Sequence, residues 1–367
     1  MRLSYYTLLL LALFTTGCLQ AQDKRQQIPG LALADAPLSA AQDAIFAEME
    51  RAIMADSFPN TTSVLLLQDG KLIYEGYFGY GDELLLNDTR SATKSLTALM
   101  AGVAIEAGLL AEDQLVFPLL PDLAPVENDS PLKQQVTVAD LLSMSSALAC
   151  NDNEGTSPGN EANMYPLRSW SRWAVDIPAR EAYERDENGR GAFAYCTAGS
   201  FLMGQVIERV SGQTLDAFFK AHLFDPLGIE TWQWSRSPTG EYMTGGGLRL
   251  RARDLAKIGL MVLNDGVWGN TQVIPASWVQ KATSPIVVAN PFQKYGYQFW
   301  RRAWQTDCGP QEAPYMSGNG GNNVLMLPEL DAVVVLTRQN YGRNGMHQQS
   351  TRLTENYALR ALGCPTG

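Results

Sequence analysis

The sequence predicts an α/β (α+β) fold, in which an antiparallel sheet is flanked by helices from both termini and carries a mostly helical inserted lobe. Strand and helix signals occur near both ends of the chain, at residues 39–78 and 295–362. Between them, residues of about 110–240 are rich in helical patterns and loops. We therefore expect the two ends to form one lobe, with a functional cleft between it and the helical insertion.

A helix and a hairpin are predicted first. Apolar residues recur at helical spacing over residues 39–55. Two strand-like runs, 63–68 and 71–78, flank the dipeptide Asp69-Gly70, which favours a tight hairpin turn. These elements supply the N-terminal part of the expected sheet.

The rest of the chain alternates between helical and strand-like patterns. A helical pattern that follows the hairpin ends at Gly108, and no internal repeat interrupts the chain. Further helices are predicted at 138–144, 198–210, 215–222, 252–264 and 348–362, and strands at 295–301, 324–327 and 332–337.

Composition narrows the class of protein. With 367 residues, 46% hydrophobic and 18% charged, the chain can bury a sizeable core. A net charge of −10 and the lack of a basic cluster argue against nucleic acid as a partner. With only two histidines, a His-rich metal site is excluded, and neither a metal nor a cofactor is expected.

The N-terminus predicts an export signal and a lipid anchor. Residues 1–18 contain one early positive charge, a short apolar core and small residues before Cys18. This pattern resembles a bacterial lipoprotein box, although Thr15 stands where leucine is commoner; the alternative is an ordinary cleaved signal with a coincidental cysteine. Residues 19–37 are expected to form a tether, and residues 38–367 the folded domain. Leu19 favours the outer membrane.

Four cysteines remain after Cys18: Cys150, Cys196, Cys308 and Cys364. An even number in an exported protein suggests two disulfides. Three pairings are possible, and the spacing does not choose among them; free buried thiols are the alternative.

A serine and a lysine three residues apart form the main candidate for chemistry. Ser91 and Lys94 lie at the predicted start of a helix, after capping-type residues at 87–89, so both side chains share one face. A neutral lysine can take the proton of a serine nucleophile. The pattern also occurs at Ser130 and Lys133, in a polar loop where no helix is expected. For Ser91, the alternative is a helix cap beside a solvated lysine.

Several further segments accompany the Ser91 helix in a characteristic order. Together they resemble the serine β-lactamase-like hydrolases, which include class C β-lactamases, DD-peptidases, esterases and amide hydrolases. The resemblance covers nearly the whole mature chain and implies a β-lactamase/transpeptidase-like fold. The segments are 91–99, 136–146, 193–199, 224–228, 245–248, 252–256, 318–321 and 324–328.

The resemblance assigns roles to individual residues. It implies that Ser91 is the acylated nucleophile, Lys94 its base and Tyr195 a second proton-transfer group. It also implies that the Ser91 backbone N–H and a group near Gly318 and Asn319 stabilise the oxyanion. The alternative for Tyr195 is a core aromatic with a satisfied hydroxyl.

The sequence departs from the family pattern at two motifs. Thr197 replaces the asparagine of a Tyr-x-Asn motif, which leaves a shorter hydroxyl as the expected substrate-binding group. A Lys/His-x-Gly motif is represented by Met316-Ser317-Gly318, which removes a cation. Both changes argue against an anionic β-lactam or D-Ala-D-Ala substrate and favour a neutral ester or amide.

The resemblance also suggests which cysteines pair. Cys196 directly follows Tyr195, and Cys150 lies just after the 136–146 segment, so a Cys150–Cys196 bond would tie the tyrosine segment to it. A Cys308–Cys364 bond would then join the C-terminal part.

These observations predict a serine hydrolase that cleaves a small-molecule ester or amide. The alternatives are a DD-carboxypeptidase or class C-like β-lactamase, and a non-catalytic binding lipoprotein with the same fold. The expected location is the periplasmic face of the cell envelope, with the outer membrane favoured and the lipid anchor as the only membrane contact.

Overall fold

A computed structural model describes residues 30–34 and 37–364. The predicted signal peptide, including Cys18, lies outside these residues. Among the described residues, no helix combines the length and the apolar character needed to cross a membrane.

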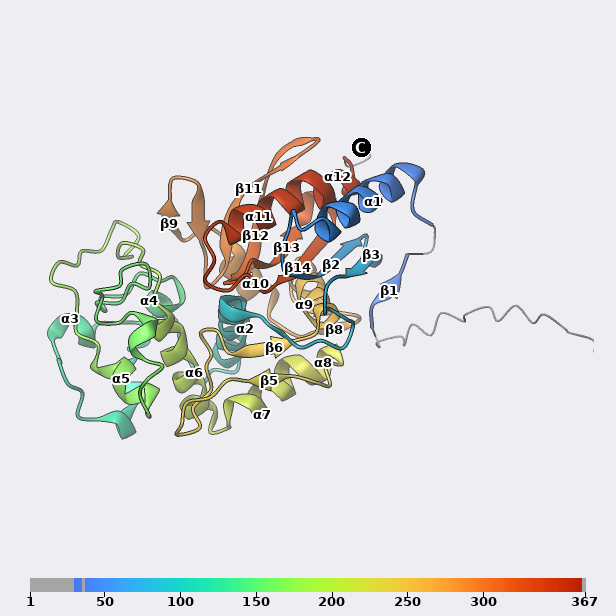
Figure 1. Ribbon diagram of the computed structural model, residues 1–367. Coiled ribbons are helices and arrows are strands. Elements are labelled where there is room, and N and C mark those ends of the chain that lie inside the picture. The colour runs from blue at the N-terminus through green and yellow to red at the C-terminus, as the bar shows by residue number, and fades with distance from the viewer. Residues whose placement is uncertain (1–29, 35–36, 365–367) are drawn as a thin grey trace, which may run out of the picture.

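A nine-stranded sheet forms the centre of the molecule, in the order β1-β3-β2-β14-β13-β12-β11-β10-β9 (Figure 1). Every neighbouring pair is antiparallel except β1 with β3. The strands are β1 (Ala32–Leu33), β2 (Thr61–Gln68), β3 (Lys71–Tyr77), β9 (Val287–Asn290), β10 (Gln293–Tyr295), β11 (Trp300–Thr306), β12 (Gly309–Gly318), β13 (Asn322–Leu327) and β14 (Ala332–Arg338).

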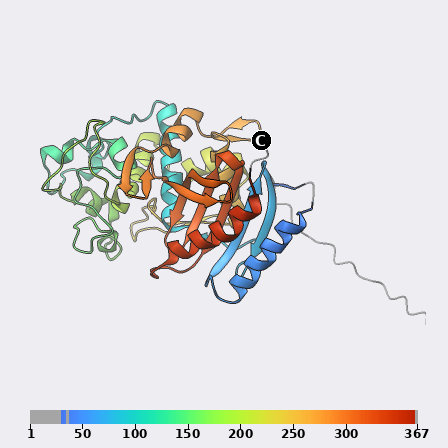
Figure 2. The ribbon, with the colours of Figure 1, turned by 90° about the horizontal axis from the view of Figure 1, so that it is seen from above.

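Helices from both termini cover the sheet, as predicted. The two helices α1 (Ala40–Met54) and α12 (Leu359–Leu362) pack on one face together with α11 (Met346–Leu353), and Figure 2 shows α1 beside the C-terminal helices. The two helices α2 (Thr93–Glu106) and α9 (Ala252–Leu263) belong to the core on the opposite face.

Strand β2 contributes side chains to both layers. Val64 and Leu66 belong to the core beneath α1, whereas Leu65 and Leu67 belong to the core that contains α2 and α9. Successive strand residues point to opposite faces, so a sheet covered on both sides needs such a continuous apolar run.

The middle of the chain forms a lobe of short helices and loops, at the left of Figure 1. Its helices are α3 (Pro131–Gln134), α4 (Val138–Leu142), α5 (Trp170–Asp176) and α6 (Thr197–Ser211). The next helices along the chain, α7 (Leu215–Phe219) and α8 (Asp225–Leu227), lie to the right of this lobe in Figure 1. A small sheet of β4 (Asn87–Asp88), β6 (Leu248–Leu250) and β5 (Gln233–Trp234) lies where this lobe meets α2. The remaining elements are α10 (Ala276–Thr283), β7 (Val267–Trp268) and β8 (Thr271–Gln272).

The hairpin prediction is confirmed. Asp69 and Gly70 have φ angles of +51° and +71° between β2 and β3. Two consecutive residues with positive φ match the right-handed twist of the strands that they join.

Other local predictions are wrong. Residues 295–301 do not form one strand, because β10 ends at Tyr295, β11 begins at Trp300, and Gln298 between them has a φ of +62°. A helix, α3, does begin after Ser130. Ala32 and Leu33, expected in the tether, pair with β3.

Candidate active site

Ser91 and Lys94 are brought together at the start of α2. Ser91 lies in a single 3₁₀ turn, Arg90–Ala92, which leads directly into the helix. Lys94 Nζ is 3.0 Å from Ser91 Oγ and also donates to the carbonyl oxygen of Gly245. Lys94 is 1% exposed, so the lysine lies beneath a half-buried serine. The three-residue spacing therefore produces the predicted contact.

The backbone before Ser91 is held in an unusual conformation. Arg90 has a φ of +50°, which is uncommon and costly for a residue with a side chain. Its N–H donates to Asp88 Oδ1 at 3.1 Å, and its guanidinium lies 4.3 Å from the ring centre of Tyr341. Thr89 Oγ1 donates to Leu248 O at 2.7 Å. These contacts fix the segment that presents Ser91. The expected cap is absent, because no side chain hydrogen-bonds to the start of the 3₁₀ turn.

Tyr195 reaches the same place from the segment before α6. The ring centre of Tyr195 is 5.0 Å from Lys94 Nζ, and the ring stacks on Trp300 of β11 at 5.7 Å. Cys196 forms a disulfide with Cys150, and Cys308 with Cys364, so both expected bonds are present. The first bond joins the tyrosine segment to the loop that follows α4.

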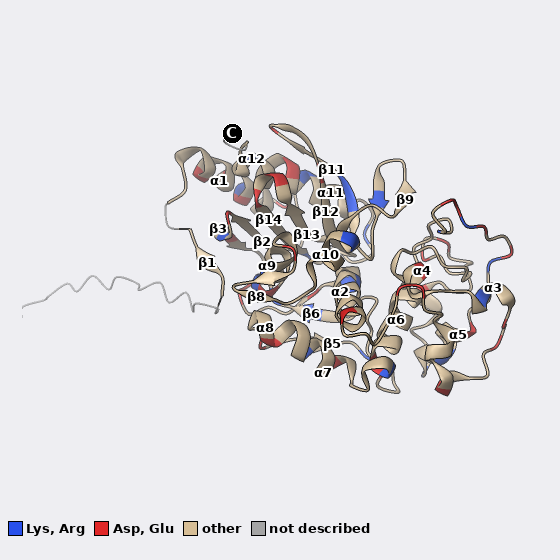
Figure 3. Cartoon of the chain, turned by 180° about the vertical axis from the view of Figure 1, so that it is seen from behind, with Lys and Arg blue, Asp and Glu red and all other residues tan. Residues whose placement is uncertain are grey.

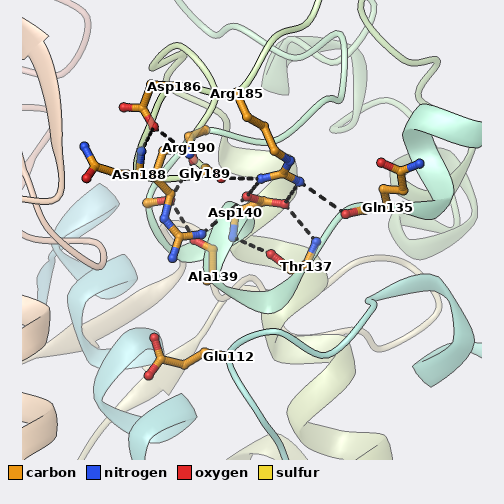
Figure 4. Close-up of polar contacts among 12 residues, drawn as sticks. Glu112, Gln135, Thr137, Ala139, Asp140, Arg185, Asp186, Asn188, Gly189 and Arg190 are labelled. Atoms are coloured by element: carbon orange, nitrogen blue, oxygen red, sulfur yellow. Dashed lines mark hydrogen bonds and ion pairs between the residues drawn. The ribbon is translucent and has the colours of Figure 1, made fainter.

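An ion-pair network supports the loop that leads to Tyr195 (Figure 4). The fully buried Asp140 of α4 accepts hydrogen bonds from Arg185 at 2.8 and 2.7 Å, and Arg190 Nη1 lies 3.5 Å away. Asp140 also accepts the N–H of Thr137 as part of a capping box. One carboxylate thus anchors both the start of α4 and the 185–190 loop. Arg185 supplies the positive charge that a buried carboxylate needs as its partner.

Ser91 opens into a cleft of about 1310 Å³ between the helical lobe and the sheet. Ser91, Asp152 and Tyr195 line one side, and strands β9–β12 line the other. Figure 3 shows basic residues on β11, beside β9, at the sheet side of this cleft. Among the residues that the structure describes, no group of three His, Cys, Asp or Glu side chains is arranged to hold a metal ion.

Gly318 and Asn319 also line the cleft, at the end of β12. A Cβ at Gly318 would lie 2.1 Å from Thr89 O, so only glycine lets this strand approach the Ser91 segment so closely. The Asn319 Oδ1 accepts the N–H of Gly342 at 2.8 Å. This bond uses an acceptor of Asn319, and its backbone N–H and amide Nδ2 are both donors that an oxyanion could use.

The two altered motifs have different positions. Met316 is fully buried, whereas the next residue, Ser317, lines the cleft. Thr197, expected to bind substrate, is fully buried and does not line the cleft. A Cβ at Gly245 would meet Thr197 Cγ2 at 2.6 Å, so the threonine packs closely against the segment that binds Lys94. The structure therefore gives Thr197 a place behind the cleft wall.

Sequence reasoning missed Asp152 and the aromatic wall at Trp300. Asp152 lies two residues after Cys150, and its N–H donates to Tyr195 O at 2.8 Å. The Cys150–Cys196 bond, once predicted, was the available signal, because it places the residues after Cys150 beside the tyrosine. No comparable signal pointed to Trp300, because the sequence predicted one strand over residues 295–301, whereas β11 begins at Trp300.

The fold and the Ser-x-x-Lys site define a class of serine hydrolase. The beta-lactamase family model matches residues 46–358, and the chain belongs to this family, most of whose members are serine hydrolases.

Relatives within this group differ in activity. The 6-aminohexanoate-dimer hydrolase of Paenarthrobacter ureafaciens is 27% identical over 296 residues, which cover 75% of this chain and 71% of that protein. Two solved structures share the fold: a putative beta-lactamase from Bacteroides dorei (15% identity, TM-score 0.68, 87% of this chain and 98% of that one) and EstCE1, a hydrolase with promiscuous acyltransferase activity (17% identity, TM-score 0.67, 86% and 99%).

Proposed function

We propose that this protein hydrolyses an ester or amide through an acyl-enzyme on Ser91. The observation that carries the proposal is the 3.0 Å contact between Lys94 Nζ and Ser91 Oγ at the floor of an open cleft. A nucleophile within hydrogen-bond reach of its base, held by a third group, is the arrangement that covalent catalysis requires. Gly245 O is that third group.

The proton path follows from the contacts of Lys94. In its neutral form, one N–H donates to Gly245 O while the lone pair takes the Ser91 proton. Ser91 Oγ then bonds to the carbonyl carbon, and Lys94 or Tyr195 returns the proton to the departing alcohol or amine. Water next attacks the acyl ester, releases a carboxylic acid and restores Ser91. The backbone N–H groups of Ser91 and Asn319 are the proposed oxyanion donors.

A fluorophosphonate probe tests this proposal directly, because it reacts with an activated serine. We expect labelling of the full-length protein and none of Ser91→Ala. Tyr195→Phe keeps the ring that stacks on Trp300 and removes only the hydroxyl. We expect it to lower ester turnover by roughly a hundred-fold. A wild-type protein that fails to label would support the non-catalytic binding lipoprotein instead.

A neutral acyl substrate is favoured over a β-lactam or a D-Ala-D-Ala peptide. The support is the buried Met316, which leaves no cation at that position to hold a carboxylate. Relatives named as a dimer hydrolase and as a hydrolase with acyltransferase activity are consistent with such chemistry. Parallel assays with a short-chain aryl ester and a chromogenic cephalosporin separate the two, and turnover of the cephalosporin alone would overturn this preference.

The proposal includes a lipid anchor at Cys18 and a location at the periplasmic side of the outer membrane. Cys18→Ser should abolish incorporation of labelled palmitate and release the protein into the soluble fraction. Palmitate incorporation into Cys18→Ser would exclude this residue as the lipidation site.

A further inference from the structure

The side-chain amide of Asn322 lies between the two segments that carry the proposed oxyanion donors. Asn322 is the first residue of β13 and is 3% exposed. Its Nδ2 donates to Asp88 O at 3.1 Å and to Asn319 O at 3.0 Å. Asp88 belongs to the segment that presents Ser91, and Asn319 belongs to the turn between β12 and β13. One buried side chain therefore joins the two segments.

The same amide is fixed from a third direction. Its Oδ1 accepts the backbone N–H of Arg338, the last residue of β14, at 2.9 Å. A side-chain amide has two donor hydrogens and one acceptor oxygen, so Asn322 uses every one of these groups. An ionised aspartate only accepts and an aliphatic side chain does neither, so neither can make this set of bonds.

The other end of the turn is held through the side chain of Arg338. Ser350 of α11 donates its hydroxyl to Gly321 O at 2.7 Å and accepts Arg338 Nη1 at 3.0 Å. The guanidinium is fully buried, and hydrogen bonds to five oxygen atoms fix it: Pro59 O, Thr61 Oγ1, Met346 O, Gln349 Oε1 and Ser350 Oγ. The turn is thus anchored at Asn319 through Asn322 and at Gly321 through Ser350.

Few other contacts can set the distance between the two segments. Asp88 and Asn322 are 234 residues apart in the sequence. Among the described residues, no hydrogen bond between backbone groups joins the turn at 318–322 to the segment at 87–91. An oxyanion hole depends on donors that are held in place before the reaction, and a misplacement of about 1 Å can lower a rate by about a hundred-fold.

We infer that Asn322 is a positioning residue, which sets the distance between the backbone N–H groups of Ser91 and Asn319 and so forms the oxyanion hole. The inference rests on the proposed function, because an oxyanion forms only if Ser91 is acylated. Asn322 does not line the cleft, so it acts through other residues and not through substrate. Loss of its amide should therefore weaken transition-state stabilisation and leave substrate binding nearly unchanged.

Asn160 provides a matched control, because its amide makes the same set of bonds at another buried position. Its Nδ2 donates to Asp152 O at 3.2 Å and to Glu154 O at 3.1 Å, and its Oδ1 accepts the N–H of Ala162 at 3.0 Å. Asn160 is 8% exposed and does not line the cleft. Asn160→Ala and Asn322→Ala therefore remove equivalent hydrogen bonds, but only the second variant releases the oxyanion segments.

The experiment measures ester kinetics and the rate of fluorophosphonate labelling for the full-length wild type and both variants. Labelling also places an oxygen of the probe in the oxyanion hole, so it reports the same donors without the deacylation step. Asn322→Ala should lower kcat and the labelling rate by roughly 10- to 100-fold, with KM within about threefold of the wild type. Asn160→Ala should keep kcat within about threefold, even if urea unfolding shows a similar loss of stability in both variants.

Two further variants keep the test decisive. Asn322→Asp retains the acceptor for the N–H of Arg338 and loses both donors, so it should lower kcat at least as much as Asn322→Ala. Ser350→Ala releases only the Gly321 end of the turn and should lower kcat by about three- to tenfold at unchanged KM. If neither variant of Asn322 folds, the Ser350→Ala result decides, and a kcat equal to that of the wild type would overturn the inference.

A folded Asn322→Ala protein with wild-type kcat would also overturn it, as would an equal loss of kcat in Asn160→Ala. In either case, labelling of the wild type at Ser91 would leave the proposed function standing. A wild type that neither labels nor hydrolyses esters would remove the proposed function, and the role of Asn322 with it.

Discussion

The chain contains the same Ser-x-x-Lys pattern twice, and the two copies have different structures. Lys94 donates to Ser91 Oγ, whereas Lys133 donates its side chain to Glu127 O at 3.0 Å. The Ser130 hydroxyl instead accepts the backbone N–H of Lys133 at 3.2 Å and caps α3. Both lysines are buried, so burial does not distinguish them.

The difference lies in how the serine is used. A serine that caps a helix with its side chain has its oxygen aimed at the backbone and away from its lysine. Ser91 is free of that task because Asp88 accepts the N–H of Arg90 and Thr89 binds Leu248 O. Long-range contacts to the 245–248 segment thus make one copy of the pattern a candidate active site.

Replacing the two serines should give the largest contrast. Ser91→Ala removes the proposed nucleophile and should lower ester hydrolysis by at least about a thousand-fold. Ser130→Ala should keep wild-type turnover, since Ser130 does not line the cleft. Steady-state kinetics with an aryl ester provides the measurement. Comparable rates for Ser91→Ala and the wild type would remove Ser91 from the mechanism.

Replacing the two lysines should give the next largest contrast. Lys94→Met keeps an apolar stem of similar length and removes the proposed base, so kcat should fall by roughly 10²–10⁴-fold. Lys133→Met should leave kcat and KM unchanged. If both variants lose activity together, the comparison fails, because a general effect on folding would then explain the loss.

The pH dependence of stability should distinguish Lys133 in a different way. Burial lowers the pKa of Lys133 to about 8, below the usual value for lysine of about 10.4. Between these two values the unfolded chain binds more protons than the folded protein, so the contribution of Lys133 to the free energy of unfolding rises with pH. Below pH 8 the cost of burying the charge is fully present.

Urea unfolding at pH 7.5, 8.5 and 9.5 measures this effect. The free energy of unfolding of the wild type, minus that of Lys133→Met, should increase across the series. A difference that stays constant with pH would show that folding does not change the pKa of Lys133.

The smallest expected effect is the loss of the Ser130 cap. Ser130→Ala leaves the N–H of Lys133 without its acceptor and should lower the free energy of unfolding by about 1 kcal/mol. Ser130→Asp retains an acceptor for this N–H and should keep most of the free energy of unfolding that Ser130→Ala loses. Chemical denaturation gives both values, and equal losses in the two variants would show that capping is not the cause.

Local features of the fold were accessible to sequence reasoning. The β2–β3 hairpin, the helix α1 and the Ser91–Lys94 pair depend on residues within a few positions of one another. The ten-residue strand β12 was missed, because Pro310 and Pro314 interrupt its pattern and argue against an interior strand. Strand β12 nevertheless lies between β11 and β13.

Contacts between residues far apart in the sequence limited how much of the site could be predicted. Lys94 and Gly245 are 151 residues apart, and no local pattern predicts that the carbonyl of Gly245 meets the lysine. Thr197 was expected at the substrate because the resemblance supplied its position in a motif, but only packing showed that it is buried. Asp152 became visible through the disulfide that brings its loop to Tyr195.

The order of strands has a practical consequence for attaching the protein to a surface. The first described residues join the sheet at β1, whereas the cleft is lined by strands at the opposite edge. At about 4.8 Å per strand spacing, β12 lies five spacings or roughly 24 Å from β1, and β9 lies eight spacings or roughly 40 Å from it. A lipid, an affinity tag or a solid support attached ahead of residue 30 therefore enters the fold far from the cleft and should leave it open to substrate.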